Sequence, residues 1–251
     1  MYSSFASVYD LLMRDVDYAG WADFYAERLL ERGVMAGAQV VECACGTGGL
    51  TIPLSRCFRM TGVDASEDML NIAVRKARES GRDIRFVRQD MRKLKLHRAV
   101  DAVLCTCDGP NYLMTSKQLK DFFCAAHSAL GAGGVVALDV STEHKLQHVL
   151  GDNTLGKSDS DTCVLWQNEW EAARRRVHMQ LDIFSRRDDG AYDRAVETQS
   201  QQAWRMEELE RSLSECGFED IRVFGDVGNQ APTDTEHRIH ITAVKTALEE
   251  R

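Results

Sequence analysis

The stretch that decides the fold reads VVECACGTGG and covers residues 40–49. A short apolar run ends in an acid and two cysteines and then breaks into glycines, which is typical of a buried parallel strand followed by a tight turn. Three interpretations are open at this point: a metal loop built on Cys43 and Cys45, a phosphate loop, or a turn shaped for another ligand. The turn lacks Gly-Lys-Ser/Thr, which excludes a nucleotide-hydrolysing P-loop.

Strand-like and helix-like segments alternate along most of the chain. The patterns predict helices over 18–32, 50–57, 66–81, 116–134 and 205–218, and strands over 38–45, 59–66, 84–91, 100–109, 135–140, 219–226 and 238–245. Such alternation is typical of a doubly wound, mostly parallel α/β sheet.

The pattern changes after residue 141, where strand-like runs are joined by short polar turns. Arg187–Gly190 reads RDDG and carries the Asp-Gly signal of a β-hairpin. We therefore expect an antiparallel insert. The predicted domains are an N-terminal helical cap (1–36), a core (37–141 plus 204–251) and the insert (142–203).

Composition narrows the class of protein. The 251 residues are 44% hydrophobic and 28% charged, with a net charge of −8, which is typical of a globular protein and argues against nucleic-acid binding. No run approaches the length of a membrane span, and the N-terminus lacks a signal-peptide pattern. We expect a cytoplasmic protein, not associated with membranes, whose eight cysteines are reduced.

An acid at the end of the second predicted strand points to the ligand. Asp64 lies 18 residues after Gly46. Ligands of open parallel sheets bind at the carboxyl ends of the strands, where such an acid can accept hydrogen bonds from ribose hydroxyls. A nucleoside or nucleotide ligand is therefore expected.

Five segments in the right order resemble the class I S-adenosylmethionine-dependent methyltransferases. They read VVECACGTGGLTIPL, GVDASEDML, FVRQDM, DAVLCTCDGPNYL, and GFEDIRVFGD with RIHITAVK. The resemblance covers about residues 1–141 and 204–246. It implies a seven-stranded Rossmann-like sheet whose last strand is antiparallel, with S-adenosyl-L-methionine as the cofactor.

The resemblance also implies roles for particular residues. The cofactor-binding set is Tyr9, Glu42, Ala44, Gly46, Gly48, Asp64, Ala65, Met69, Asp90, Met91 and Cys107. Within this set, Glu42 and the glycine turn would hold the methionine end of the cofactor. Asp64 would bind the ribose hydroxyls, and Asp90 would recognise the adenine.

Candidate catalytic residues follow the fourth predicted strand or lie in the insert. They are Asp108, Asn111 and His178. An amine acceptor needs little help, whereas a hydroxyl acceptor needs a general base, for which Asp108 and His178 are the candidates. Asn111 would orient the acceptor, together with Tyr112.

A narrower resemblance, in the N-terminal aromatic segment and the insert, is to a bacterial branch that includes amino-sugar N,N-dimethyltransferases. This resemblance implies that the insert (142–203) acts as a substrate lid. The predicted function is methyl transfer to nitrogen or oxygen of a small-molecule acceptor. The alternatives are an RNA or protein methyltransferase, a non-catalytic S-adenosylmethionine-binding module, and a nicotinamide-dependent oxidoreductase. A homodimer formed through the insert is an open alternative to a monomer.

Two cysteine pairs, Cys43 with Cys45 and Cys105 with Cys107, fall at the ends of strands expected to be neighbours. Four thiols could bind a metal, but buried strand cysteines commonly serve as small hydrophobic residues. We predict no metal site.

Overall fold

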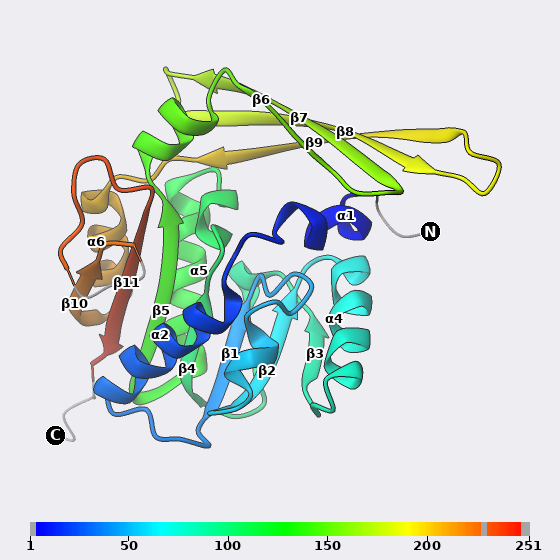
Figure 1. The fold of residues 1–251 in the computed structure, drawn as a ribbon. Coiled ribbons are helices and arrows are strands. Elements are labelled where there is room, and N and C mark those ends of the chain that lie inside the picture. The colour runs from blue at the N-terminus through cyan, green and yellow to red at the C-terminus, as the bar shows by residue number, and fades with distance from the viewer. Residues whose placement is uncertain (1–3, 227–229, 247–251) are drawn as a thin grey trace, which may run out of the picture.

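The computed structural model describes residues 4–226 and 230–246, and predictions that fall on the remaining residues lie outside this description. A seven-stranded sheet forms its centre (Figure 1), in the order β10-β11-β5-β4-β1-β2-β3. The strands are β1 (Gln39–Cys43), β2 (Arg59–Asp64), β3 (Arg85–Arg88), β4 (Val100–Cys105), β5 (Leu130–Ser141), β10 (Phe218–Phe224) and β11 (Arg238–Lys245). Strand β11 is antiparallel to both of its neighbours. The predicted sheet is therefore confirmed.

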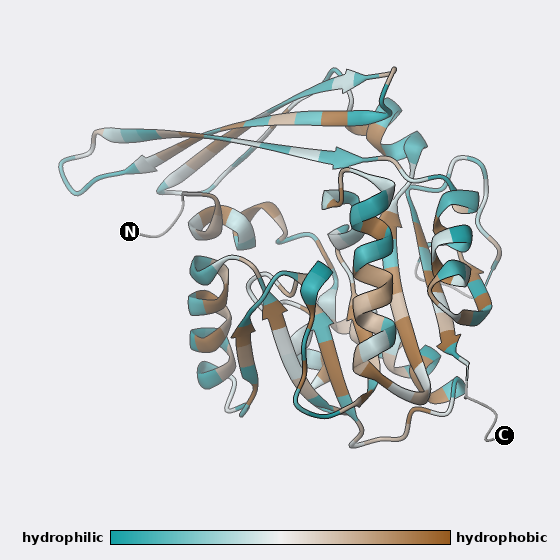
Figure 2. Ribbon diagram, turned by 180° about the vertical axis from the view of Figure 1, so that it is seen from behind, coloured by the Kyte–Doolittle hydropathy of each residue, from teal (hydrophilic) through white to brown (hydrophobic). Residues whose placement is uncertain are grey.

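Strand β1 lies between β2 and β4, so the chain order reverses beside it. Its residues Val40 and Val41 are almost fully buried, as the apolar run predicted. Figure 2 shows hydrophobic residues concentrated in the strands of this sheet. The reversal creates a crevice at the carboxyl ends of β1 and β4, which is where open α/β sheets bind ligands.

Helices cover both faces of the sheet. The core helices are α2 (Tyr18–Glu31), α3 (Thr51–Leu54), α4 (Glu67–Glu79), α5 (Ser116–Ala129) and α6 (Met206–Glu215), with short 3-10 turns η1 (Met91–Lys93) and η2 (Gly109–Tyr112). Side chains of α2 and α3 pack in one apolar cluster, and those of α5 and α6 in another. Ser66 caps α4, because its hydroxyl accepts a hydrogen bond from the Met69 amide at 3.3 Å.

Several helices end earlier than predicted, and two of them show why. Helix α3 ends at Leu54 rather than at residue 57, and Pro53, which has no amide hydrogen to donate, lies within its only turn. Helix α5 ends at Ala129, and β5 already begins at Leu130 instead of at residue 135. Leu130 takes an extended conformation with ψ of 145°, which ends the helix before the glycines that the predicted helix had included.

The insert is a separate four-stranded antiparallel sheet, in the order β6-β7-β8-β9. Its elements are the helical turn η3 (Lys145–Leu150) and strands β6 (Thr154–Ser158), β7 (Thr162–Glu171), β8 (Arg176–Arg186) and β9 (Tyr192–Gln202). The predicted hairpin joins β8 to β9, with Gly190 at a φ of 82°. These strands lie within 142–203, while the three domain ranges themselves stay a prediction.

Helix α1 (Ser4–Leu12) lies beneath the insert, between its sheet and α4 (Figure 1). Val8 packs into the apolar cluster formed by η3 and the inner face of the insert. On the opposite side, the carboxylate of Asp10 pairs with Lys76 of α4 at 2.8 Å. The N-terminal cap thus holds two helices, of which the sequence pattern had predicted only the second.

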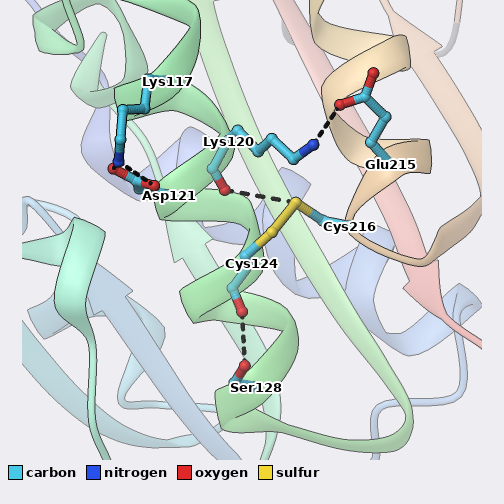
Figure 3. The surroundings of a disulfide bond; sticks show 7 residues. All are labelled: Lys117, Lys120, Asp121, Cys124, Ser128, Glu215 and Cys216. Carbon is cyan, nitrogen blue, oxygen red and sulfur yellow. Dashed lines mark hydrogen bonds and ion pairs between the residues drawn. A yellow bond between two sulfur atoms is a disulfide. The ribbon is translucent and has the colours of Figure 1, made fainter.

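A disulfide joins Cys124 of α5 to Cys216, which directly follows α6 (Figure 3). An ion pair between Lys120 and Glu215, at 2.7 Å, crosses the same helix interface. This corrects the expectation that all eight cysteines are reduced, because the fold brings together two thiols that are 92 residues apart in sequence. Within the described part of the chain, no helix is long and apolar enough to span a membrane.

Candidate functional site

A cavity of about 560 Å³ opens at the carboxyl ends of β1, β2 and β4, and α1 and β9 form its far wall. Nine of the residues predicted to bind the cofactor line it. They are Tyr9, Ala44, Gly46, Asp64, Ala65, Met69, Asp90, Met91 and Cys107. The fold therefore brings most of the predicted set into one crevice.

The glycine turn is fixed by the acid at the end of β2. Ala44 and Gly46 both have positive φ, of 53° and 52°, so the backbone curls around the mouth of the crevice. The Gly46 amide donates to Asp64 Oδ2 at 2.9 Å, and the Ser66 amide donates to Asp64 Oδ1 at 2.8 Å. Burial raises the pKa of Asp64, although these amides oppose the rise. One carboxylate thus ties the turn, β2 and the start of α4 together.

Two predicted cofactor contacts, Glu42 and Gly48, lie behind the turn instead of lining the cavity. Glu42 is only 2% exposed and accepts hydrogen bonds from the hydroxyls of Thr51 and Thr106. Burial raises its pKa to about 7. A Cβ added to Gly48 would lie 3.3 Å from the Cβ of Ala73, so this glycine lets the turn approach α4 closely. Both residues therefore shape the turn from behind.

Asp90 lies at the mouth of the cavity after β3. It accepts hydrogen bonds from the amide and the guanidinium of Arg92, at 2.9 Å each to Oδ1. The hydrogen bond from Arg92 lowers the pKa of Asp90. Its neighbour Met91 places its sulfur 3.7 Å from the thiol of Cys105 on β4, which fixes the apolar side of the same wall.

Asp108 is held in an ion-pair network rather than free for proton transfer. It accepts a hydrogen bond from Ser141 Oγ at 2.7 Å, pairs directly with Arg238, and has the ammonium of Lys145 at 3.8 Å. Burial would raise the pKa of Asp108, but Arg238 and Lys145 outweigh it and hold the pKa well below its usual range. This corrects the expectation of a general base, because an acid with so low a pKa accepts protons poorly.

Asn111 is fully buried, and every polar atom of its amide is engaged. Its Nδ2 donates to the carbonyls of Ser141 and Gln202, at 3.0 and 2.9 Å, and its Oδ1 accepts from the Ser141 amide at 2.9 Å. The side chain therefore joins η2 to β5 and β9. This corrects its predicted role in orienting the acceptor.

His178 lies on the outer face of the insert. Val177 and Met179, its neighbours on β8, are buried in the apolar cluster on the inner face, so the alternation of the strand points His178 the other way. Its ring nitrogens contact Ser200 Oγ at 2.9 Å and Glu171 Oε2 at 3.1 Å. The structure does not bring this histidine to the cavity, which corrects the prediction that it faces the acceptor.

Two residues that the sequence analysis missed hold the segment after β4. The buried carboxylate of Asp139 on β5 accepts hydrogen bonds from the amides of Cys107 and Asp108, at 2.8 and 3.0 Å, and pairs with Arg238 on β11. The guanidinium of Arg238 also lies 4.8 Å from the ring centroid of Trp21. In the sequence, the only indication of this role was that Asp139 is the single acid within the apolar run VVALDV.

The far wall contains further residues that the sequence analysis missed. They are Phe5 of α1, Gln118 of α5, and Glu197 and Gln199 of β9. The hydroxyl of Tyr112 on η2 donates to Gln199 Oε1 at 3.0 Å, which links the core to the insert. In the sequence, only the period-2 alternation of β9 groups Glu197 with Gln199 on one face, and this alternation does not tell which face of the strand meets the cavity.

The cysteine pairs do come together, with Cys43 opposite Cys105 in the register of β1 and β4. Burial raises the pKa of both thiols, so they stay protonated and bind metals weakly. Across residues 4–226 and 230–246, no cluster of three or more His, Cys, Asp or Glu side chains is placed to hold a metal ion.

Comparison with known proteins gives a consistent result. Residues 40–134 match the family model described as "Methyltransferase domain". The chain is 34% identical to "Putative methyltransferase YqeM" of Bacillus subtilis, over 98% of each protein. It is 32% identical to an S-adenosylmethionine-dependent methyltransferase from Clostridium acetobutylicum, whose crystal structure matches with a TM-score of 0.86 over 97% of this chain and 98% of that one. The sugar N-methyltransferase KedS8 from Streptoalloteichus shares the fold, with 22% identity and a TM-score of 0.76 over 95% of this chain and 92% of that one.

Proposed function

Because this chain belongs to the S-adenosylmethionine-dependent methyltransferases, we propose that it transfers a methyl group to a nitrogen or oxygen atom of a small-molecule acceptor. The observation that carries this proposal is the continuity of the cavity. One wall comes from the carboxyl ends of the core strands, and the other from α1 and β9. A single cavity can therefore hold a cofactor on the core side and an acceptor beneath the insert.

The residues on the core side fit S-adenosylmethionine. The positive φ angles of Ala44 and Gly46 turn the backbone along the edge of the cavity. Asp64 accepts two backbone amides and has further lone pairs that can accept hydrogen bonds from ribose hydroxyls. Asp90 and Met69 line the same cavity, so we assign the adenine amino group to the carboxylate of Asp90 and an apolar contact to Met69. The bound cofactor supplies an already activated methyl group, so the protein mainly aligns the acceptor and excludes water.

The acceptor side supports a small molecule. Helix α1 closes over the cavity, with a Tyr9 ring carbon 3.7 Å from the position that a Cβ on Gly46 would take. This leaves little room for a macromolecular chain between cap and core. The fold likeness to the sugar N-methyltransferase KedS8 favours an amino sugar as one candidate acceptor. A homodimer formed through the insert and a cytoplasmic location stay predictions.

The test is incubation of the protein with methyl-labelled S-adenosylmethionine and the low-molecular-weight fraction of an extract from the source cells. We expect label in a small molecule, at a nitrogen or oxygen atom. If the label appears only in protein or RNA from whole extract, the proposed acceptor class is wrong. If the protein binds the cofactor in calorimetry but labels nothing, the protein is a binding module instead.

A further inference from the structure

We propose that Glu197 of β9 selects the methyl acceptor by pairing with a positively charged amine. This inference rests on the proposed function and deepens it, because it names the chemical class of acceptor for the same cavity. The acceptor would be a small molecule that carries an ammonium group at neutral pH.

The strand register places Glu197 on the wall opposite the cofactor-binding turn. Glu197 pairs with Leu181 of β8 and Gln199 pairs with Met179, and both partners are buried on the inner face of the insert. Glu197 and Gln199 therefore share that inner face, and both line the cavity. Figure 1 shows β9 passing above α1 at the open end of the core sheet.

The charges around the cavity leave Glu197 without a cation. Its Oε1 accepts a hydrogen bond from the Phe5 amide at 2.7 Å, while within the described ranges no lysine or arginine lies within ion-pair distance of it. Asp64 already accepts two backbone amides, and Asp90 is paired with Arg92. A cationic ligand would complement this half-buried carboxylate, because charge-assisted hydrogen bonds are strongest away from bulk water.

The positions of the two predicted general bases support the same class of acceptor. Asp108 is held by Arg238 and Lys145, and His178 lies on the outer face of the insert. Neither of the two residues predicted as bases is therefore available to a hydroxyl acceptor, whereas an amine needs only to lose one proton.

The transfer step balances with an amine. The ammonium loses one proton to solvent, and the nitrogen lone pair then forms a bond to the methyl carbon. The bond between that carbon and sulfur breaks, and its electron pair stays on sulfur. Positive charge therefore moves from sulfur to nitrogen, where the carboxylate of Glu197 stabilises it.

The experiment repeats the labelling with wild-type protein, Glu197→Gln and Asp193→Asn. The amide of Glu197→Gln keeps an acceptor for the Phe5 amide but removes the charge. Asp193 lies on the same strand outside the cavity, pairs with Arg187 at the surface, and provides a control with the same chemical change. The labelled small-molecule product is passed over a cation-exchange resin at neutral pH, and cofactor affinity is measured by calorimetry.

We expect the wild-type product to be retained on the resin. Glu197→Gln should lower kcat/KM for the methyl acceptor by about tenfold to a hundredfold, as for the loss of one charged hydrogen bond. Cofactor affinity should stay within about twofold, and Asp193→Asn should behave as wild type. Label in a product that has no amino group overturns the inference, as does unchanged kcat/KM in Glu197→Gln, which would mean that Glu197 only caps α1. Failure to bind cofactor or to label any small molecule would instead contradict the proposed function.

Discussion

Replacing Asp64 with alanine should weaken both the turn and the cofactor site. The carboxylate accepts the Gly46 amide at 2.9 Å and the Ser66 amide at 2.8 Å, and alanine leaves both amides without these acceptors. Both glycine and serine are only half-buried, so water can partly replace the lost acceptor. We therefore expect the free energy of unfolding to fall by about 1–3 kcal/mol, near the lower limit for two unpaired amides.

The effect on the cofactor is larger. If Asp64 also accepts two ribose hydroxyls, alanine removes two charge-assisted hydrogen bonds, so Kd for S-adenosylmethionine should rise by about a hundredfold. Isothermal titration calorimetry measures the affinity, and urea unfolding without cofactor measures the stability. Asp64→Asn separates the two effects, because it keeps the volume and one amide acceptor. Asp83→Asn, at an exposed position before β3, is the matched control.

A particular outcome would refute this reasoning. If Asp64→Asn and Asp64→Ala both bind S-adenosylmethionine within about twofold of wild type while their stability falls as expected, then the carboxylate only supports the turn. The ribose would have to be bound elsewhere.

Three further predictions concern the glycine turn, the buried Glu42 and the disulfide. Gly46→Val should abolish detectable cofactor binding in calorimetry, because a β-branched side chain is strained at a φ of 52° and would point toward the ring of Tyr9; normal binding would show that the turn is misplaced. Burial raises the pKa of Glu42 to about 7, above its ordinary value of 4.5. The folded state therefore binds this proton more tightly than the unfolded state, and the contribution of Glu42 to the free energy of unfolding falls as pH rises from 4.5 to about 7. In urea unfolding, the free energy of unfolding of Glu42→Gln should therefore rise by about 3 kcal/mol relative to that of the wild type across this pH range. A difference between the two proteins that does not change with pH would contradict the assignment. Cys124→Ser should lower the unfolding free energy by about 2–5 kcal/mol in oxidising buffer and have little effect in reductant, and equal melting in both buffers would argue against the disulfide.

The sequence contained most of the core of the site. Strand β1, its glycine turn and Asp64 could be found from an apolar run, a break and a spacing, because these features are local and parallel strands end at a common edge. The cap on α4 and the β8–β9 hairpin were equally local. Nine of the predicted cofactor residues consequently line one cavity.

The predictions that failed depended on where side chains point and what they pair with. His178 differs from Met179 by one position on β8, and that single step places it on the opposite face of the insert. The sequence did not show that Asp108 is paired, because its partner Arg238 lies on β11, 130 positions further along the chain.

The sequence alone thus determined the doubly wound sheet, the turn and the acid that faces it, because periodicity and glycine placement act over a few residues. Only the tertiary structure decided that Glu42 supports the turn from behind, that Arg238 and Lys145 neutralise the acid after β4, and that Glu197 faces the cavity. Burial and charge pairing arise between elements that are distant in sequence, and their outcome depends on how two sheets and a short helix pack around one crevice.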